Sequence, residues 1–168
     1  IEKPVKVKKP YILCYLFGKH KYIGDFVEYA AAKTGFEVIV LPFTDRERDS
    51  KYKKLYNIGP AEFAWLIDNA ELVITDSFHA TAFSINLNTP FYSLLRNDYN
   101  DKNNMNSRIF SILQLTELND RIITKDTELP WKFDYLMSFD DANRRISEKR
   151  VADIDFLHCA LKGEGKQE

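Results

Sequence analysis

The sequence predicts an α/β fold, a three-layer, Rossmann-like parallel sheet, and three observations carry this prediction. Short apolar runs without polar alternation recur along the chain, as expected for strands covered on both faces. Segments with helical spacing of apolar residues separate these runs. The chain has 168 residues, 45% of them hydrophobic, which suffices for one domain with a sizeable core.

The first half of the chain alternates strand and helix. Residues 11–17 form a continuous apolar run that a glycine ends, which predicts a buried strand. Residues 22–33 carry apolar side chains at helical spacing and precede Thr-Gly, a common helix stop. Residues 36–41 are expected to be a second buried strand, because a proline follows them. Residues 44–57 are polar with mixed charges, which predicts a loop or an exposed helix.

A second unit begins at Gly59-Pro60, because proline suits the first turn of a helix. The apolar pattern then predicts a helix at 61–69, a strand at 72–75, a helix at about 78–87 and a strand at 91–95. Repetition of strand and helix in this order implies parallel strands joined by right-handed crossovers.

The last third is less regular. It predicts a polar, Asn-rich loop at 96–105, a short helix at 106–115, a short edge strand at 121–123 and a long closing helix at 140–162. We therefore expect these domain bounds: a lead-in or linker at 1–10, a single Rossmann-like domain at 11–162 and a frayed tail at 163–168.

Composition excludes several classes of protein. With 24 basic and 25 acidic residues, the net charge of -1 argues against a nucleic-acid binder. Two cysteines, Cys14 and Cys159, with three histidines supply neither a disulfide framework nor a zinc site, so we expect no metal and no cofactor. No apolar stretch is long enough to span a membrane, and no signal peptide is visible, so we expect a cytoplasmic location.

Ligands of open α/β sheets bind outside the carboxyl ends of the strands. This rule nominates the loops at 18–22, 76–81 and 96–105, of which the second is the richest in functional groups. It brings a carboxylate, two hydroxyls and an imidazole to the start of a helix, where backbone N–H groups and the helix dipole favour a phosphate or carboxylate.

Simpler roles stay open for the same residues. Asp76 and Ser77 can each serve as helix caps, and His79 can be an ordinary first-turn histidine. His20 lies in the first of the nominated loops, whereas His158 on the closing helix is expected to be structural. Neither a Gly-x-Gly-x-x-Gly nor a Walker-type Gly-Lys-Ser/Thr pattern is present, which disfavours a nucleotide-cofactor site.

Three stretches, at residues 59–70, 72–85 and 88–91, resemble the polysaccharide pyruvyl transferase family. The central stretch reads Asp-Ser-Phe-His-Ala-Thr from Asp76 and continues Ala-Phe-Ser, and the similarity covers most of residues 11–161. The family usually has Gly where this chain has Ala80, which fits if that residue is helical with a negative φ. The resemblance implies the C-terminal lobe of a two-lobed fold similar to that of B-type glycosyltransferases. The start at Ile1 and the lysine-rich lead-in agree with a C-terminal fragment whose N-terminal lobe is missing.

The activity that the resemblance implies is transfer of pyruvate from phosphoenolpyruvate to a glycan or lipid-linked sugar acceptor, as a ketal, in the synthesis of cell-surface polysaccharide. His79 aligns with the family's functional histidine and is expected to donate a proton or to contact the phosphate, because imidazole exchanges protons near neutral pH. The residues expected to bind substrate are Ser77, Thr81, Arg96, Lys102 and Arg108. A lipid-linked acceptor would also place the protein at the membrane surface, although this sequence supplies no anchor.

Two other functions fit the same pattern. A nucleotide-sugar glycosyltransferase lobe would use a similar sheet and helix start, and a non-catalytic interaction module needs no ligand at all. If the chain is a pyruvyl transferase lobe, we expect the lobe alone to be inactive or nearly so, since the missing half is expected to supply the acceptor site and further cations.

Overall fold

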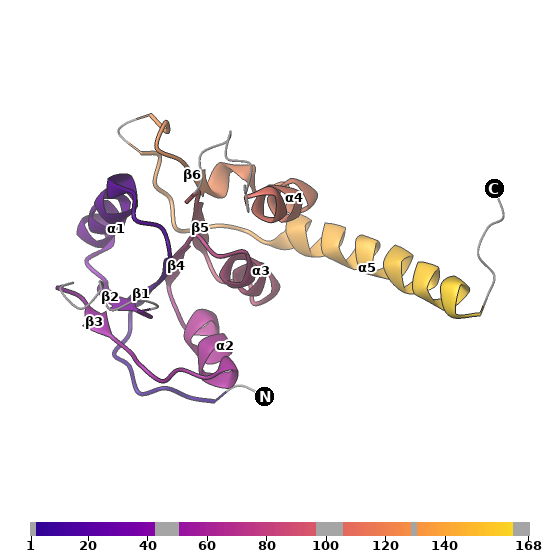
Figure 1. The fold of residues 1–168 in the computed structure, drawn as a ribbon, viewed down its shortest axis with the longest axis horizontal. Coiled ribbons are helices and arrows are strands. Elements are labelled where there is room, and N and C mark those ends of the chain that lie inside the picture. Colours follow the sequence, from indigo (N-terminus) through magenta and orange to yellow (C-terminus); the bar gives the residue numbers. More distant parts are fainter. Residues whose placement is uncertain (1–2, 43–50, 97–105, 129–130, 163–168) are drawn as a thin grey trace.

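The computed structural model describes residues 3–42, 51–96, 106–128 and 131–162. Six parallel strands form one sheet in the order β3-β2-β1-β4-β5-β6, with helices against it (Figure 1). This arrangement confirms the predicted Rossmann-like α/β fold. The strands are β1 (Tyr11–Tyr15), β2 (Glu37–Val40), β3 (Lys53–Lys54), β4 (Leu72–Thr75), β5 (Phe91–Leu94) and β6 (Ile122–Ile123).

The helices follow the sequence pattern closely. They are α1 (Lys21–Thr34), α2 (Pro60–Asp68), α3 (Phe78–Asn86), α4 (Ser107–Thr116), the 3-10 turn η2 (Asn119–Arg121) and α5 (Asp140–Leu161). Gly35 ends α1 in the left-handed conformation, at φ 69°, and Pro60 opens α2 after its N-cap Gly59, as the sequence predicts.

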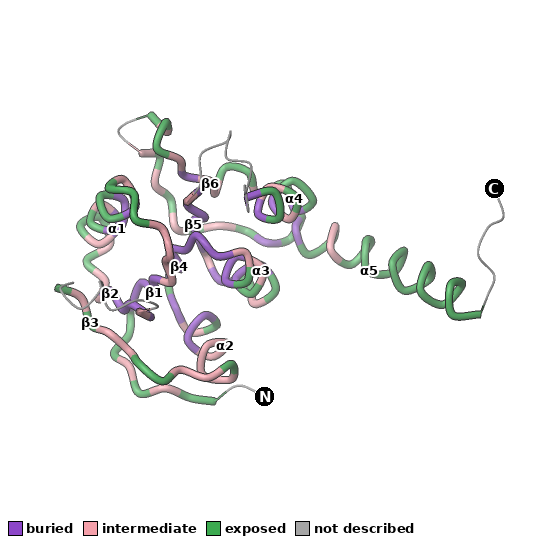
Figure 2. The backbone as a smooth tube through the Cα atoms, in the orientation of Figure 1, coloured by how far each residue is buried: buried purple, intermediate pink, exposed green. Residues whose placement is uncertain are grey.

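Alternate side chains of the central strands pack into two separate hydrophobic cores, one on each face of the sheet. Tyr11 and Leu13 of β1 point to the face that α2, α3 and α4 cover, whereas Ile12 and Cys14 point to the face that α1 covers. An extended segment, residues 131–135, completes the second face with Trp131, Phe133 and Tyr135. Burial on both faces explains why the strands read as continuous apolar runs (Figure 2).

Two features differ from the sequence-based expectation. The polar segment 44–57 contains a strand, β3, whose Lys53 and Lys54 pair with Ile39 and Val40 at the edge of the sheet. A two-residue edge strand has no apolar run to reveal it. In addition, the expected capping by Asp76 is absent, because the N-cap of α3 is Ser77 and no side chain caps that helix.

The lead-in lies against the domain along the described residues 3–10. Lys3 forms an ion pair with Glu62 of α2, 2.7 Å long, and Lys9 Nζ donates a 2.7 Å hydrogen bond to Asn69 Oδ1. Val5 and Val7 pack on the core beside α2 and α3. The tail at 163–168 lies outside the described residues.

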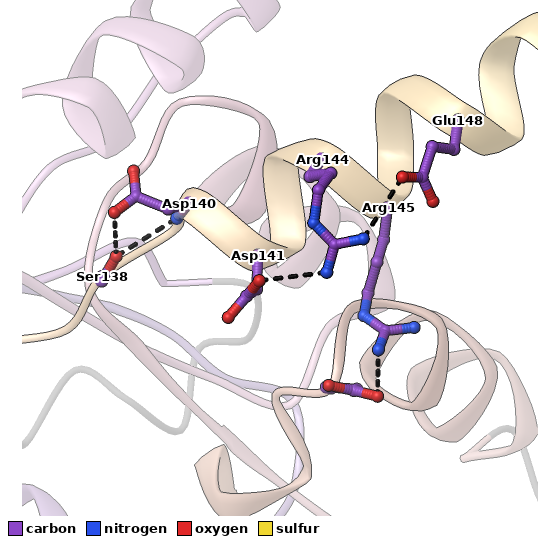
Figure 3. Close-up of polar contacts among 7 residues, drawn as sticks. Ser138, Asp140, Asp141, Arg144, Arg145 and Glu148 are labelled. Atoms are coloured by element: carbon purple, nitrogen blue, oxygen red, sulfur yellow. Dashed lines mark hydrogen bonds and ion pairs between the residues drawn. The ribbon is translucent and has the colours of Figure 1, made fainter.

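Only the first part of α5 packs on the domain. Arg145 forms an ion pair with Glu117 at the end of α4, and Arg144 links Asp141 and Glu148 along the helix (Figure 3). Ser138 Oγ donates to Asp140 Oδ2 and accepts from the Asp140 N–H, which organises the start of the helix (Figure 3). Residues 151–162 are all exposed, and this half of α5 projects from the molecule (Figures 1 and 2).

Candidate active site

The strand order reverses between β1 and β4, and the carboxyl ends of these two strands lie side by side. In open parallel sheets this switch point is where ligands bind. Asp76 follows β4 directly, and its carboxylate accepts hydrogen bonds from two backbone N–H groups after β1. The Phe17 N–H lies 2.9 Å from Oδ1, and the Gly18 N–H lies 2.6 Å from Oδ2. Asp76 therefore ties the two strand ends together instead of capping α3.

Gly18 occupies a position that has no room for a side chain. A Cβ atom there would lie 2.7 Å from Ile23 Cδ1, 2.9 Å from Asp76 Oδ2 and 3.0 Å from Arg96 Cβ. Contacts this short force neighbouring groups to move. The glycine thus allows the loops after β1, β4 and β5 to approach one another.

Burial sets the protonation behaviour of Asp76. Only 1% of the residue is exposed, and this desolvation raises the pKa of its carboxyl above the ordinary value of 3.8. The backbone N–H groups of Phe17 and Gly18 and the charge of Arg96 oppose the rise without cancelling it. The Asp76 carboxyl is buried, and its oxygens accept hydrogen bonds from two backbone N–H groups. It therefore suits a structural role better than the binding of a metal ion or the transfer of a proton, which need an exposed carboxyl.

Arg96 comes from the loop after β5 and faces the same corner. Its guanidinium lies over the Phe17 ring, 5.1 Å from the centroid, and its backbone carbonyl lies 2.9 Å from His20 Nε2. Arg96 is half-buried. Its positive charge lies near the loop after β1, where it contacts Phe17, and near Asp76 after β4. Two of the three loops that the sequence nominates thus contact each other through Arg96 and His20, and the third meets them through Asp76.

Hydrogen bonds to buried hydroxyl groups fix the start of α3. Ser77 is buried and adopts the extended conformation of an N-cap, and its N–H donates to Thr75 Oγ1 over 3.1 Å. Thr81 is fully buried, and its hydroxyl donates to the Ser77 carbonyl and lies 2.8 Å from Ser93 Oγ. The structure therefore places Thr81 beneath the helix start rather than on its surface. Ala80 is helical and absent from the described residues with positive φ, so its methyl group brings no backbone strain.

His79 and Arg108 flank Phe78 at the surface of this helix start. The His79 ring lies 5.7 Å from the Phe78 ring, and the Arg108 guanidinium of α4 lies 5.2 Å from it. Both His79 and Arg108 are exposed. An imidazole and a guanidinium thus both contact one aromatic ring at the start of α3, where the helix dipole is positive.

An aromatic cleft of about 650 Å³ opens beside His79. Its volume falls in the range of small-molecule sites, roughly 300–1,000 Å³. The lining residues are Tyr15, Leu41, Pro42, Leu55, Tyr56, Asn57, Ile58, Gly59, Pro60, Phe63, His79 and Phe83. They come from the ends of β1 and β2, the segment after β3, and the N-terminal halves of α2 and α3, with Phe83 on the second turn of α3.

Sequence reasoning missed most of this cleft. The nominated loops did not include residues 55–60, because β3 was not expected and residues 44–57 were predicted to be a loop or an exposed helix. A turn signal was available at Asn57, which adopts a left-handed φ of 58° that asparagine tolerates better than most residues. Of the cationic side chains predicted to bind substrate, Lys102 lies outside the described residues. The other two, Arg96 and Arg108, are described.

Searches for other kinds of site gave negative results within the described ranges. There, no group of three or more His, Cys, Asp or Glu side chains could hold a metal ion. No helix in that part of the chain is both long and apolar enough to cross a bilayer.

Comparison with solved structures finds nucleotide-sugar epimerases. UDP-GlcNAc 2-epimerase from Methanocaldococcus jannaschii matches 85% of this chain and 39% of its own, with 16% identity and a TM-score of 0.49. The same organism's UDP-GlcNAc 2-epimerase, in complex with UDP-GlcNAc and UDP, matches 84% of this chain and 45% of its own, with 18% identity and a TM-score of 0.48. This chain thus spans less than half the length of either match. No curated protein sequence matches it.

The sheet and its flanking helices define a Rossmann-like α/β domain with a polar strand-to-helix turn after β4. The sequence model of the family "Polysaccharide pyruvyl transferase" matches residues 6–99, more than half of the 168 residues, and this match includes Ser77, His79, Thr81 and Arg96. The chain belongs to the polysaccharide pyruvyl transferase family.

Proposed function

We propose that this chain binds phosphoenolpyruvate at the start of α3 and serves as the donor-binding lobe of an enzyme that pyruvylates a polysaccharide or its lipid-linked precursor. The observation that carries the proposal is the position of His79, in the family-matched region, on the first turn of α3, where it shares the Phe78 ring with Arg108. Family membership supports the reaction class, and an exposed imidazole that contacts the same ring as a guanidinium supports the donor.

Each residue has a role in this proposal. The N-terminal backbone of α3 and the Ser77 turn receive the phosphate or the carboxylate, because a helix start favours anions. Arg96 and Arg108 supply positive charge, and Lys102 is a further candidate from the same edge. Thr81 acts indirectly, since its buried hydroxyl braces the carbonyl of Ser77 against Ser93.

The chemistry requires one proton donor and a place for the leaving phosphate. A proton adds to the methylene carbon of phosphoenolpyruvate, which makes the methyl group and an oxocarbenium-like centre at the next carbon. Two sugar hydroxyls add to that centre as the bond between it and the phosphate oxygen breaks. One hydroxyl proton replaces the proton given to carbon, and the other leaves with phosphate. We assign the proton transfer to His79, because an imidazole can both donate and accept a proton.

Ligand-dependent thermal unfolding tests the donor site. A ligand that binds only the native state raises the melting temperature with concentration. We expect phosphoenolpyruvate to raise the melting temperature of this chain more than inorganic phosphate does, and His79→Ala and Arg96→Gln to weaken the effect. The matched controls are His158→Ala and Arg150→Gln, both exposed on α5, which should leave it intact.

The outcomes separate the candidate functions. A phosphoenolpyruvate shift that His79→Ala and Arg96→Gln leave unchanged would remove the donor site from this corner. A shift with a nucleoside-diphosphate sugar, with phosphoenolpyruvate inert, would favour a glycosyltransferase lobe instead. A domain that responds to neither ligand would count against both.

A further inference from the structure

The aromatic cleft has the wrong electrostatics for the donor. Among its described lining residues, His79 is the one side chain that can carry a positive charge near neutral pH, and none is a carboxylate. Phosphoenolpyruvate is a compact polyanion that needs cations, and the candidate cations Arg96 and Arg108 are not among the residues that line the cleft. The volume of about 650 Å³ is also far larger than a three-carbon acid requires. The cleft therefore suits a larger, uncharged ligand.

Its walls combine flat aromatic faces with a few polar groups. Tyr15 and Phe63 meet edge to face with centroids 5.1 Å apart, and Phe63 meets Phe83 at 5.7 Å. Tyr56 is 56% exposed and Phe83 41% exposed, so both offer open ring surface. Asn57, His79 and the tyrosine hydroxyls supply hydrogen-bonding groups along the same walls.

This mixture matches a pyranose ring. The C–H faces of such a ring are apolar and pack on aromatic rings, while its hydroxyls point outward and bond to neutral polar groups. Burial raises the pKa of Tyr15, and the Asp76 carboxylate reinforces that rise, so this phenol stays a neutral hydroxyl. A cluster of aromatic faces with neutral donors and acceptors favours an uncharged polyhydroxylated ligand over an anion.

We propose that the aromatic cleft binds the neutral pyranose ring of the acceptor, stacked on Tyr56 and Phe83, so that this one lobe holds acceptor as well as donor. This assignment rests on the proposed function, in which the hydroxyls of the acceptor react with the donor at His79.

The position of His79 connects the two sites. It lines the cleft, and it also sits beside Phe78, whose other ring contact is Arg108. Along the other wall, Tyr15 meets Phe17 at 4.8 Å, and Phe17 lies under Arg96. A ring held by its apolar faces leaves its hydroxyl-bearing edge free, and ketal formation needs two hydroxyls on that edge near the donor. Cleft and cations are thus continuous through side chains that touch.

Saturation-transfer NMR on this chain with methyl glucopyranoside, methyl galactopyranoside and methyl mannopyranoside tests the proposal. Transfer should reach the ring C–H protons of at least one glycoside, and Tyr56→Ala and Phe83→Ala should each reduce it several-fold. Phe156→Ala is the matched control, because this aromatic residue is 72% exposed on the projecting half of α5 and should leave transfer unchanged. The variants alter exposed side chains, and circular dichroism checks that each remains folded.

Several results would overturn the assignment: no transfer to any glycoside, equal transfer in Tyr56→Ala and Phe83→Ala, or transfer to uridine with none to the glycosides. Its failure is distinguishable from that of the donor proposal. A phosphoenolpyruvate shift that depends on His79, without glycoside binding, removes only the cleft assignment. Glycoside binding that Tyr56→Ala abolishes, without any phosphoenolpyruvate effect, supports the cleft and removes the donor site.

Discussion

At the scale of single residues, the corner after β1 and β4 depends on two groups with opposite requirements. Gly18 is needed because it has no side chain: a Cβ atom there would collide with Ile23, Asp76 and Arg96. Asp76 is needed for its two oxygens, which accept from the N–H groups of Phe17 and Gly18. Together they fix the loop on which Arg96 rests.

Gly18→Ala should destabilise the protein by about 1–3 kcal/mol, because the new methyl group displaces groups from a packed corner. The same change at Gly24 is a matched control. A Cβ there meets nothing within 4 Å, so Gly24→Ala within α1 should stabilise the chain by about 0.5–1 kcal/mol. Urea unfolding of both variants measures the two values. Equal effects would show that the corner is not closely packed.

The pH dependence of stability should report the buried carboxyl of Asp76. Its pKa lies above the ordinary 3.8 in the folded protein, so it contributes stability below that value and loses the contribution as pH rises through the folded pKa. Asp76→Asn cannot titrate. Across the window just above pH 3.8, the unfolding free energy of Asp76→Asn minus that of the unaltered protein should therefore increase with pH.

Denaturant unfolding of the two proteins at a series of pH values measures this difference, in which the other titrating groups cancel. A flat difference would mean that folding does not shift the pKa of this carboxyl, and a difference that falls with rising pH would mean that the site lowers it; either result would contradict the prediction.

At the scale of elements, prediction from sequence succeeded where a segment carries its own signal. Strands buried on both faces read as apolar runs, and β4 spans the predicted residues 72–75. The two-residue β3 and the aromatic segment at 131–135 gave weaker signals, because each depends on a neighbour for its structure. Trp131, Phe133 and Tyr135 do alternate with polar residues, a period-2 pattern that fits a strip packed on one side.

The site divides in the same way. Its polar residues after β4 could be found from sequence, because a strand-to-helix turn has a fixed place in this fold. The role of Asp76 could not, since its partners Phe17 and Gly18 lie 59 and 58 residues away along the chain. The cleft was equally hidden, because Tyr15, Tyr56 and Phe83 come from three separate segments.

The projecting half of α5 should contribute little to folding stability. Residues 151–162 are exposed, so a chain that ends after Arg150 should lose less than about 1 kcal/mol of unfolding free energy. Leu113→Ala provides the contrast: Leu113 is fully buried on α4, and its loss should cost about 2–5 kcal/mol. Denaturant unfolding compares the two. A truncation as costly as Leu113→Ala would mean that the outer helix packs on the domain.

At the scale of the whole molecule, three groups of residues gather near the carboxyl ends of β1 and β4. Asp76 ties the two strand ends together, Arg96 and Arg108 lie over the rings of Phe17 and Phe78, and an aromatic cleft includes His79 in its lining. His79 lines the cleft and also contacts Phe78, the ring over which Arg108 lies. The proposed function therefore depends most on whether the donor reaches this imidazole.

The chain contains only three histidines, which makes that question directly measurable. In proton NMR each imidazole gives a separate Hε1 resonance, and His79→Ala identifies its own. If the donor binds at His79, phosphoenolpyruvate, titrated at constant pH, shifts the His79 resonance in a saturable way and leaves that of His158 in place. A titration that moves only His20 or His158, or no imidazole at all, would contradict donor binding at His79.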